Sequence, residues 1–258
     1  MRRLVGASVV AVGLVTLWQL LVTALELPHY ILPGPLRVAS AWYEAAGLIG
    51  RHAVTTAEEI VLGLLAGAVL GLSSALVMMR FRALHAWVMP LLVLSQALPV
   101  FALAPILVLW LGYGLASKVA MAVLIIYFPV TAACYDGLRG TDVGWLDLAH
   151  TLGASRRAVL WQVRFPAALP ALASGLRIAT AVAPIGAVVG EWVGSSRGLG
   201  YLMLHANARM EIDLMFAALL TLGVLAIGLY FVVDVGLRRM VYWQHAMSPE
   251  GGAASEIR

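Results

Sequence analysis

Long apolar blocks, separated by short segments that hold most of the charges, divide the chain. An α-helix needs about 20 mostly apolar residues to cross the hydrocarbon layer of a membrane. Six blocks approach or exceed this length: Leu4–Leu25, Ile60–Met79, Trp87–Trp110, Val119–Tyr135, Ala167–Gly190 and Leu214–Val233. The pattern therefore predicts an all-α integral membrane protein with about six transmembrane helices, in one membrane domain over residues 1–258.

The third apolar block is rich in proline. It belongs to a stretch of 35 residues, Ala83–Ser117, that contains no Lys, Arg, Asp or Glu. Pro90, Pro99 and Pro105 lie within this stretch, and a proline inside a helix removes a hydrogen bond and adds a steric clash. We therefore expect this span to be kinked or broken.

The two ends of the chain differ from the core, which we place at about residues 55–240. The first block follows Arg2 and Arg3, as in a secretory signal, but a signal has an apolar region of only about 7–15 residues. This block is longer and Thr23–Glu26 is a poor cleavage site, so we interpret residues 1–25 as a retained span. The Gly- and Ala-rich tail, residues 248–258, is predicted to be flexible.

Composition supports a membrane location. Of the 258 residues, 62% are hydrophobic and only 12% are charged, whereas a soluble domain carries about 25% charged residues. The single cysteine, Cys134, excludes an internal disulfide, and we expect it to be a small packed residue.

The positive charges predict an orientation, because cytoplasmic loops are enriched in Lys and Arg. With the N-terminus inside, eleven of the 17 Lys and Arg residues fall in inner segments and five in outer segments, while Arg177 lies within a span. Six spans then place both termini in the cytoplasm. Basic residues scattered in this way, with a net charge of +4, do not indicate nucleic-acid binding.

The inner segment between the fourth and fifth spans, Asp136–Arg164, is the most informative part of the sequence. Asp147 suits the cap or first turn of a short helix, and Gly153 would end that helix. An apolar face at helical spacing follows, formed by Val159, Leu160 and Val163. We predict a short helix-turn-helix at the cytoplasmic surface. From these residues alone, an interfacial helix with arginines near anionic lipid is an equal alternative.

The same segment resembles the signature of binding-protein-dependent ABC importer permeases: Glu-Ala-Ala, three residues, Gly, nine residues, Ile, one residue, Leu-Pro. The matching positions are Asp147, Ala149, Gly153, Val163, Phe165 and Pro166. Leu148 departs from the pattern, and Asp147 replaces the family's Glu. The resemblance implies a coupling helix that sits in a groove of a separate ATPase subunit, and it assigns this role to Asp147, Ala149, Gly153, Ala154, Val163 and Pro166.

Further motifs resemble the nitrate/sulfonate/taurine branch of these permeases. They are Gln96–Pro99, Ala104–Pro105, Trp110–Gly114, Gly190–Trp192 and Gly198–Tyr201. Within this branch, the run from Ala206 to Ala218 is most similar to permeases for the pyrimidine precursor of thiamine.

The resemblance implies import of a small solute that a periplasmic or extracellular binding protein delivers to the bacterial inner membrane. The expected substrate is a hydroxymethylpyrimidine-type thiamine precursor, with a sulfonate, taurine or nitrate as the alternative.

No Gly-x-x-x-x-Gly-Lys-Ser/Thr loop occurs in the chain. ATP and Mg are therefore expected on an ATP-binding-cassette ATPase dimer, and this chain is expected to bind no cofactor and to have no catalytic residues. A second permease copy is expected, because six spans leave little room for a pore.

The candidates for the translocation pathway or gate are Gln96, Pro99, Pro105 and Glu191. Gln96 lies at mid-membrane and must hydrogen-bond either a neighbouring helix or the solute. The prolines either expose carbonyl groups to the passage or simply bend their helices. Glu191 either belongs to a gate at membrane depth or reaches water at the outer interface.

Other residues have simpler interpretations. Arg177 is expected to be structural or to extend toward the interface, with a functional role as the alternative, and His150 is expected to be a surface residue. An aromatic belt at the outer interface, with ring stacking on a substrate as the alternative, accounts for Trp110, Tyr113, Trp192 and Tyr201. The histidines show no metal-binding spacing. A channel or proton-coupled carrier would need charges inside the spans, and an intramembrane enzyme would need clustered polar groups there; the spans supply almost none.

Overall fold

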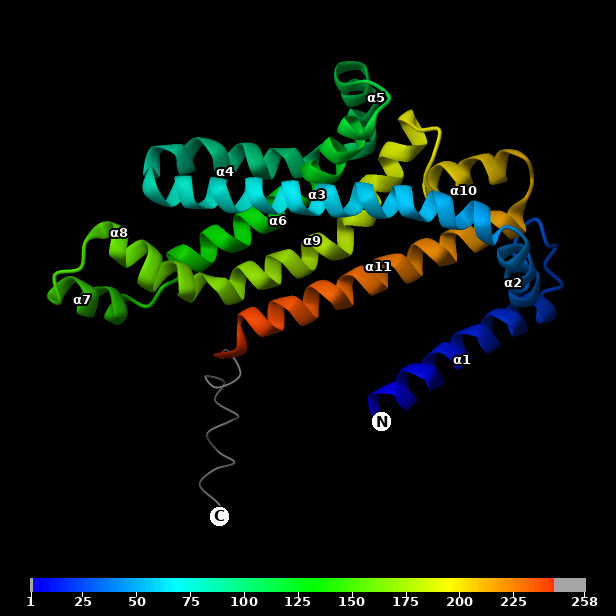
Figure 1. Cartoon of the computed structure of the whole chain (residues 1–258), viewed down its shortest axis with the longest axis horizontal. Coiled ribbons are helices and arrows are strands. Elements are labelled where there is room, and N and C mark those ends of the chain that lie inside the picture. The colour runs from blue at the N-terminus through cyan, green and yellow to red at the C-terminus, as the bar shows by residue number, and fades with distance from the viewer. Residues whose placement is uncertain (1, 244–258) are drawn as a thin grey trace, which may run out of the picture.

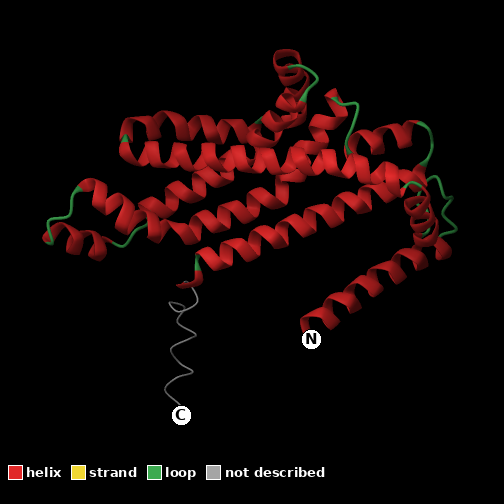
Figure 2. Ribbon diagram, in the orientation of Figure 1, coloured by secondary structure: helices red, strands yellow, loops and turns green. Residues whose placement is uncertain are grey.

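The computed structural model describes residues 2–243, which form helices joined by short loops (Figure 2). In chain order these are α1 (Arg2–Ala24), α2 (Pro35–Glu44), α3 (Ala46–Arg80), α4 (Arg82–Ala97), α5 (Val100–Leu111), α6 (Leu115–Arg139), α7 (Val143–Thr151), α8 (Arg156–Ala158), the π-helix η1 (Val159–Arg164), α9 (Phe165–Gly194), α10 (Leu199–Ala208) and α11 (Ile212–Met240). No strand occurs within residues 2–243. The predicted all-helical fold is confirmed there; the tail predicted to be flexible, residues 248–258, lies outside the described part.

Each of the six predicted spans corresponds to a helix or a helix pair. Four helical segments are long and apolar enough to cross a membrane: α3, α6, α11 and the continuous run Arg156–Gly194, which ends with α9. The bent pair of α4 and α5 forms a fifth span when it is taken together, and α1 contributes a shorter apolar helix, Val9–Ala24. The chain is therefore a multi-pass membrane protein.

The third predicted span is broken, as its prolines indicated. The axes of α4 and α5 differ by 105°. Leu98 is extended, with a ψ of 124°, because the residue before a proline avoids the helical region. Pro99 then precedes the first residue of α5, a position where the missing N–H costs no helical hydrogen bond.

Three long helices, α3, α6 and α9, form the centre of the bundle. Ala122 of α6 lies between Gly63 of α3 and Gly186 of α9. A Cβ added at Gly63 would overlap the Ala122 Cβ, and one added at Gly186 would lie 2.6 Å from the Ala122 Cα. Small residues allow this close approach, which is the usual basis of helix association where lipid removes the hydrophobic drive.

Larger side chains complete the core along α6. Ile126, Val130 and Cys134 are fully buried there, against residues of α3 and α9 such as Ile60 and Ala179. The expectation that Cys134 is a packed residue is confirmed.

An ion-pair cluster joins α9 to α11. The Nε of Arg177 lies 2.7 Å from Oδ1 of Asp234, and the Nε of Arg238 lies 2.7 Å from Oδ2 of the same carboxylate. A charge within a span is costly unless it is paired, so this contact supports the structural interpretation of Arg177.

The long helices separate two groups of short elements (Figure 1). The α7–α8 hairpin lies at one end of the bundle, near the turn between α3 and α4, whereas α2 and α10 lie at the opposite end. The second span extends further than predicted, since α3 begins at Ala46 and not at Ile60. Its additional turns carry polar residues that the α10 end of the bundle uses.

The close approach of α3 and α6 leads to a prediction about stability. Gly63→Ala should overpack the contact with Ala122 and cost about 1–3 kcal/mol, which lowers the Tm of the purified chain in detergent. Gly223→Ala on α11 is the matched control, because nothing lies within 4 Å of a Cβ at Gly223. It should keep the Tm or raise it slightly. Adding Ala122→Gly to Gly63→Ala should restore the Tm, and equal Tm values for Gly63→Ala and the control would contradict the contact.

Candidate functional site

The first helix of the hairpin, α7, begins earlier than expected. Asp142 caps it, because its Oδ1 accepts the N–H of Gly144 at 2.7 Å. Aspartate is among the best residues at this position. Asp147 is exposed in the middle of α7. The prediction that Asp147 caps or opens the helix is therefore wrong, because a closer aspartate takes that place.

The turn after α7 depends on Gly153. Its φ is +71°, in the left-handed region that glycine enters without a steric penalty. The N–H of Gly153 donates to the His150 carbonyl at 3.0 Å, and the N–H of Ala154 donates to the Ala149 carbonyl at 2.9 Å. These two bonds form a Schellman motif, which satisfies the last carbonyl groups of a helix. The predicted helix-turn-helix is confirmed.

The second half of the hairpin runs into a membrane span. Ser155 caps α8, since its Oγ accepts the N–H of Ala158 at 3.2 Å. The π-helix η1 follows, and the N–H of Phe165 reaches the carbonyl of Leu160. Pro166 comes next and has no N–H, so the regular hydrogen-bond pattern is interrupted there in any case. Such π-helical turns are frequent at functional sites.

One face of α7 is apolar and exposed. Trp145, Leu148 and Leu152 are 49%, 60% and 77% exposed, and their spacing places them on one side of the helix. Beside them, Val163 and Pro166 help to line a cavity of about 530 Å³ between the hairpin and α9. Exposed apolar surface of this kind marks a site of interaction with another molecule.

The hairpin is fastened to the bundle. All six residues that the resemblance assigns to coupling lie in it or at its junction with α9: Asp147, Ala149, Gly153, Ala154, Val163 and Pro166. The Nη1 of Arg164 donates to the carbonyl of Leu138, near the end of α6, at 3.0 Å. The position of the hairpin is therefore linked to both α6 and α9.

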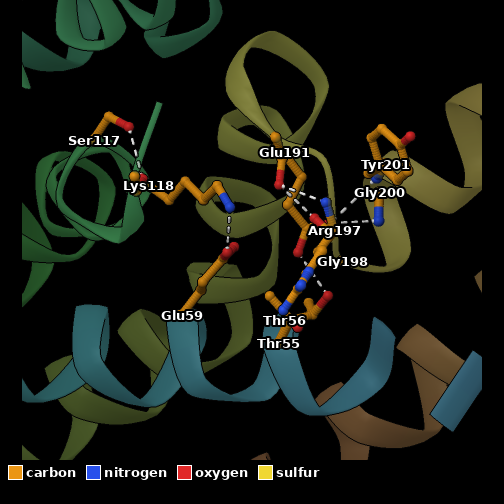
Figure 3. A network of polar contacts seen from close by, with 12 residues as sticks. Thr55, Thr56, Glu59, Ser117, Lys118, Glu191, Arg197, Gly198, Gly200 and Tyr201 are labelled. Carbon is orange, nitrogen blue, oxygen red and sulfur yellow. Dashed lines mark hydrogen bonds and ion pairs between the residues drawn. The ribbon is translucent and has the colours of Figure 1, made fainter. Parts of the chain in front are cut away.

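A polar network lies at the opposite end of the bundle (Figure 3). Glu191 of α9 is 1% exposed, and its Oε1 accepts the hydroxyl of Thr56 on α3 at 2.6 Å. Its Oε2 accepts the N–H groups of Gly200 and Tyr201. The N–H of Leu199 donates to the Thr56 hydroxyl oxygen at 2.8 Å. Together the carboxylate and the hydroxyl cap the buried start of α10, whose free N–H groups need partners.

This network corrects one interpretation of Glu191. In the chain as described its side chain does not reach water, so that alternative is wrong, while a role in a gate remains a prediction. Gly198 has a φ of +111°, and a Cβ at this position would overlap the Glu191 carboxyl group. The N–H of Gly198 donates to Nδ1 of His52 at 2.9 Å. The Gly198–Tyr201 motif therefore wraps the chain around the Glu191 carboxylate.

A buried ion pair lies beside this cap (Figure 3). Nζ of Lys118 on α6 lies 2.8 Å from Oε1 of Glu59 on α3, and the two side chains are 8% and 0% exposed. Glu59 follows Thr56 by three residues, so both project from the same face of α3. Sequence reasoning counted Lys118 among the outer charges and did not single out Glu59. The only feature in the sequence that relates Glu59 to Lys118 is that each residue directly precedes a predicted span.

The other pathway candidates lie elsewhere. Gln96 is exposed at the end of α4, and its Nε2 lies 3.4 Å from the hydroxyl of Ser95. Pro99 and Pro105 are also exposed, just before and within α5. Within the described residues, no hydrogen bond joins Gln96 to Glu191. The structure therefore divides the four candidates into an exposed α4–α5 group and the buried cap at Glu191.

The aromatic candidates also differ from one another. Trp110 and Tyr113 are 74% and 80% exposed, as an aromatic belt requires, whereas Tyr201 is partly buried and its ring lies 3.9 Å from that of His205. His150 is exposed, as predicted. Among the described residues, no group of three His, Cys, Asp or Glu side chains could hold a metal ion.

Comparison with protein families agrees with this geometry. Residues 63–241 match the family described as the binding-protein-dependent transport system inner membrane component. The match includes the hairpin, Glu191 and the Gly198–Tyr201 motif, and it spans most of the chain. The chain therefore belongs to this family of ABC transporter permeases.

Individual relatives carry permease names. A probable ABC transporter permease protein of Haemophilus influenzae is 57% identical and covers 93% of this chain and 98% of its own length. The formylaminopyrimidine transport permease protein ThiX of Halalkalibacterium halodurans is 38% identical over 83% of this chain and 86% of its own. The riboflavin transport system permease protein RibX of Chloroflexus aurantiacus is 35% identical over 93% and 90%. Taurine and aliphatic-sulfonate permeases also match, in agreement with the branch that the motifs indicated.

The same fold occurs in a solved structure. A chain of the MetNI methionine ABC transporter, crystallised in inward-facing conformations, has a TM-score of 0.63 to this chain. The two are 18% identical, and the superposition covers 76% of this chain and 97% of the other. At this identity the likeness shows a shared fold.

The buried ion pair leads to a second prediction about stability. Lys118→Met should leave the Glu59 carboxylate buried without a partner and destabilise the chain by about 3–5 kcal/mol, which thermal unfolding in detergent would show as a lower Tm. Adding Glu59→Leu should recover most of this loss, because both charges are then absent. Arg37→Gln is the control: Arg37 is exposed and lies 3.5 Å from the partly buried Asp213, and an ion pair at the surface contributes little. A double variant no more stable than Lys118→Met would contradict the pairing.

Proposed function

We propose that this chain is the membrane-spanning subunit of an ATP-driven importer, and that a separate ATPase subunit docks on the α7–α8 hairpin. The observation that carries this proposal is the exposed apolar face of α7, formed by Trp145, Leu148 and Leu152. The Asp142 cap and the Gly153 turn hold this face in one conformation, so little conformational entropy is lost when a partner binds. Family membership supports an ATPase as that partner.

The hairpin is well placed to convey movement into the membrane. α8, η1 and α9 form one helical run, Arg156–Gly194, that reaches from the hairpin to the Glu191 cap. Because α9 packs closely on Ala122 of α6, displacement of the hairpin would shift packed helices together. Closing and opening of an ATPase pair would then switch the passage between two arrangements. ATP and Mg²⁺ would be bound by the ATPase and not by this chain.

A second copy of the permease completes the passage in this proposal. Near their bend, the α4–α5 pair exposes large apolar side chains, among them Leu98 and Phe101, and the polar side chain of Gln96 is exposed there as well. A polar amide at membrane depth favours a protein or water-filled surrounding over lipid. We therefore place Gln96, Pro99 and Pro105 along a path between two copies, and the Glu191 cap at the outer end of each.

The same proposal sets the orientation. The hairpin and both termini lie on the cytoplasmic side of a bacterial inner membrane, where the positive-inside rule places the arginine-rich segments. The α2 and α10 end then faces the periplasm, where a solute-binding protein would deliver the substrate.

For the substrate we propose a hydroxymethylpyrimidine-type thiamine precursor. The name of the ThiX relative and the sequence of the run Ala206–Ala218 support this choice. The riboflavin permease relative, at nearly the same identity, makes a flavin the main alternative, and the other branch members make a sulfonate, taurine or nitrate a further one.

The docking role leads to a prediction at the turn. Gly153→Val should lose ATPase association and solute uptake, because a β-branched residue is strongly strained at a φ of +71°. Gly153→Asn is the matched control, since asparagine tolerates this conformation, and it should keep most of both. Co-purification of the ATPase, uptake in cells and the amount of permease in membranes are the measurements. Normal co-purification with Gly153→Val would count against the docking assignment.

The substrate proposal is tested on the solute-binding protein that delivers to this permease. That protein should carry a pyrimidine when it is purified from cells, and mass spectrometry of the released ligand identifies it. Uptake of the labelled pyrimidine should require both proteins. A released flavin or sulfonate would overturn the substrate proposal and leave the docking proposal intact.

A further inference from the structure

A basic cavity lies on another side of the hairpin from the apolar face. Arg80 at the end of α3, Arg156 and Arg157 of α8 and Arg164 of η1 line one cavity of about 700 Å³, together with His150 of α7. Among residues 2–243, no Asp or Glu belongs to its lining. Two parts of the chain that are distant in sequence, the end of α3 and the hairpin with η1, thus bring positive charge to one place.

This charge is not neutralised by the chain itself. Over residues 2–243, none of these four arginines takes part in an ion pair. Arg164 donates to the Leu138 carbonyl, and the guanidinium of Arg80 lies 5.2 Å from the centre of the Phe81 ring. Like charges this close together repel, so the cavity favours an anionic occupant.

Apolar side chains form the remainder of the wall. They are Met79, Val159, Leu160 and Trp161. Arg80 is the last residue of one span and Arg164 directly precedes another, so the cavity lies where helices leave the hydrocarbon layer. Trp161 is 48% exposed, and tryptophan prefers this headgroup level. A cavity lined by arginines on one part and by apolar side chains on another suits an anion that carries a hydrocarbon chain.

We propose that this cavity binds the phosphate headgroup of an anionic phospholipid, with an acyl chain against Leu160 and Trp161. Arginine offers paired N–H donors that match phosphate oxygens. The cavity shares no lining residue with the apolar groove of Trp145, Leu148 and Val163. Lipid binding and ATPase docking would therefore use different sides of the hairpin, and the lipid would set the height of the hairpin at the membrane surface. This inference goes beyond the proposed function and does not depend on the substrate.

Lipid retention by the full-length chain tests the proposal. The chain is reconstituted in nanodiscs of phosphatidylglycerol and phosphatidylcholine in equal amounts, and native mass spectrometry counts the lipids that remain bound on release. The unchanged chain should retain phosphatidylglycerol in preference. Arg80→Gln and Arg157→Gln should each weaken this retention about fivefold, the effect of one basic residue at an anionic surface. Arg80→Lys should lose less, because it keeps the charge.

Arg239→Gln is the matched control. Arg239 is exposed at the end of α11 and lies outside the cavity lining, so its loss removes the same charge at the same end of the bundle. It should retain phosphatidylglycerol as the unchanged chain does. An equal loss in Arg239→Gln would overturn the proposal in favour of a general charge effect, and undiminished retention in the Arg80 and Arg157 variants would also overturn it.

Two further measurements distinguish other occupants. Inorganic phosphate and glycerol phosphate are added as competitors; displacement of the lipid by either one at low millimolar concentration, on the order expected for a free-anion site, would overturn the lipid assignment. The ATPase is then co-purified with each variant. Variants that keep the lipid but lose the ATPase would assign the arginines to the ATPase surface instead, whereas loss of phosphatidylglycerol with the ATPase retained supports the proposal.

Discussion

The close contact of three helix backbones around Ala122 is the constraint on which the rest of the structure depends. In a membrane, burial of apolar side chains gives little net drive, so helices associate where small residues let their backbones touch. Gly63 and Gly186 provide this on both sides of α6. The contact makes α3, α6 and α9 one body, and α9 in turn connects the hairpin at one end with the Glu191 cap at the other. One continuous helical run therefore joins the two ends of the bundle.

The two ends of the α3, α6 and α9 bundle differ in where their polar and charged side chains lie. At the α10 end, Glu191 and Thr56 cap α10 and Lys118 pairs with Oε1 of Glu59, while Oε2 of Glu59 is buried with no hydrogen-bond partner among the described residues. Buried polar groups are costly without partners, so the contacts of Glu191, Thr56 and Lys118 stabilise the packing of α3, α6, α9 and α10. At the hairpin end, apolar and basic side chains stay exposed. These exposed groups form the surface on which we propose that other molecules bind.

The coupling signature has a structural explanation in its own residues. Gly153 supplies the left-handed residue of a Schellman turn, Ala149 is the buried contact of α7, and Pro166 lies where the π-helix returns to α9. Asp147 does not cap α7, because Asp142 takes that position. Its exposed carboxylate is therefore free for a contact outside the chain. The signature combines residues that shape the hairpin with one that the hairpin presents.

The sequence by itself determined the helical membrane fold, the break at Pro99 and the hairpin with its turn at Gly153. These features follow from local rules: apolar length, the missing N–H of proline and the conformational freedom of glycine. Tertiary structure alone decided the partners of the buried charges. Glu59 and Lys118 are 59 positions apart, Arg177 and Asp234 are 57 apart, and Thr56 and Glu191 are 135 apart. No local pattern relates such residues, because only the packing of α3, α6, α9 and α11 brings them within hydrogen-bonding distance. For the same reason the sequence left Glu191 between a site at membrane depth and the outer interface, and only the packing of the surrounding helices shows that its side chain is buried within the protein.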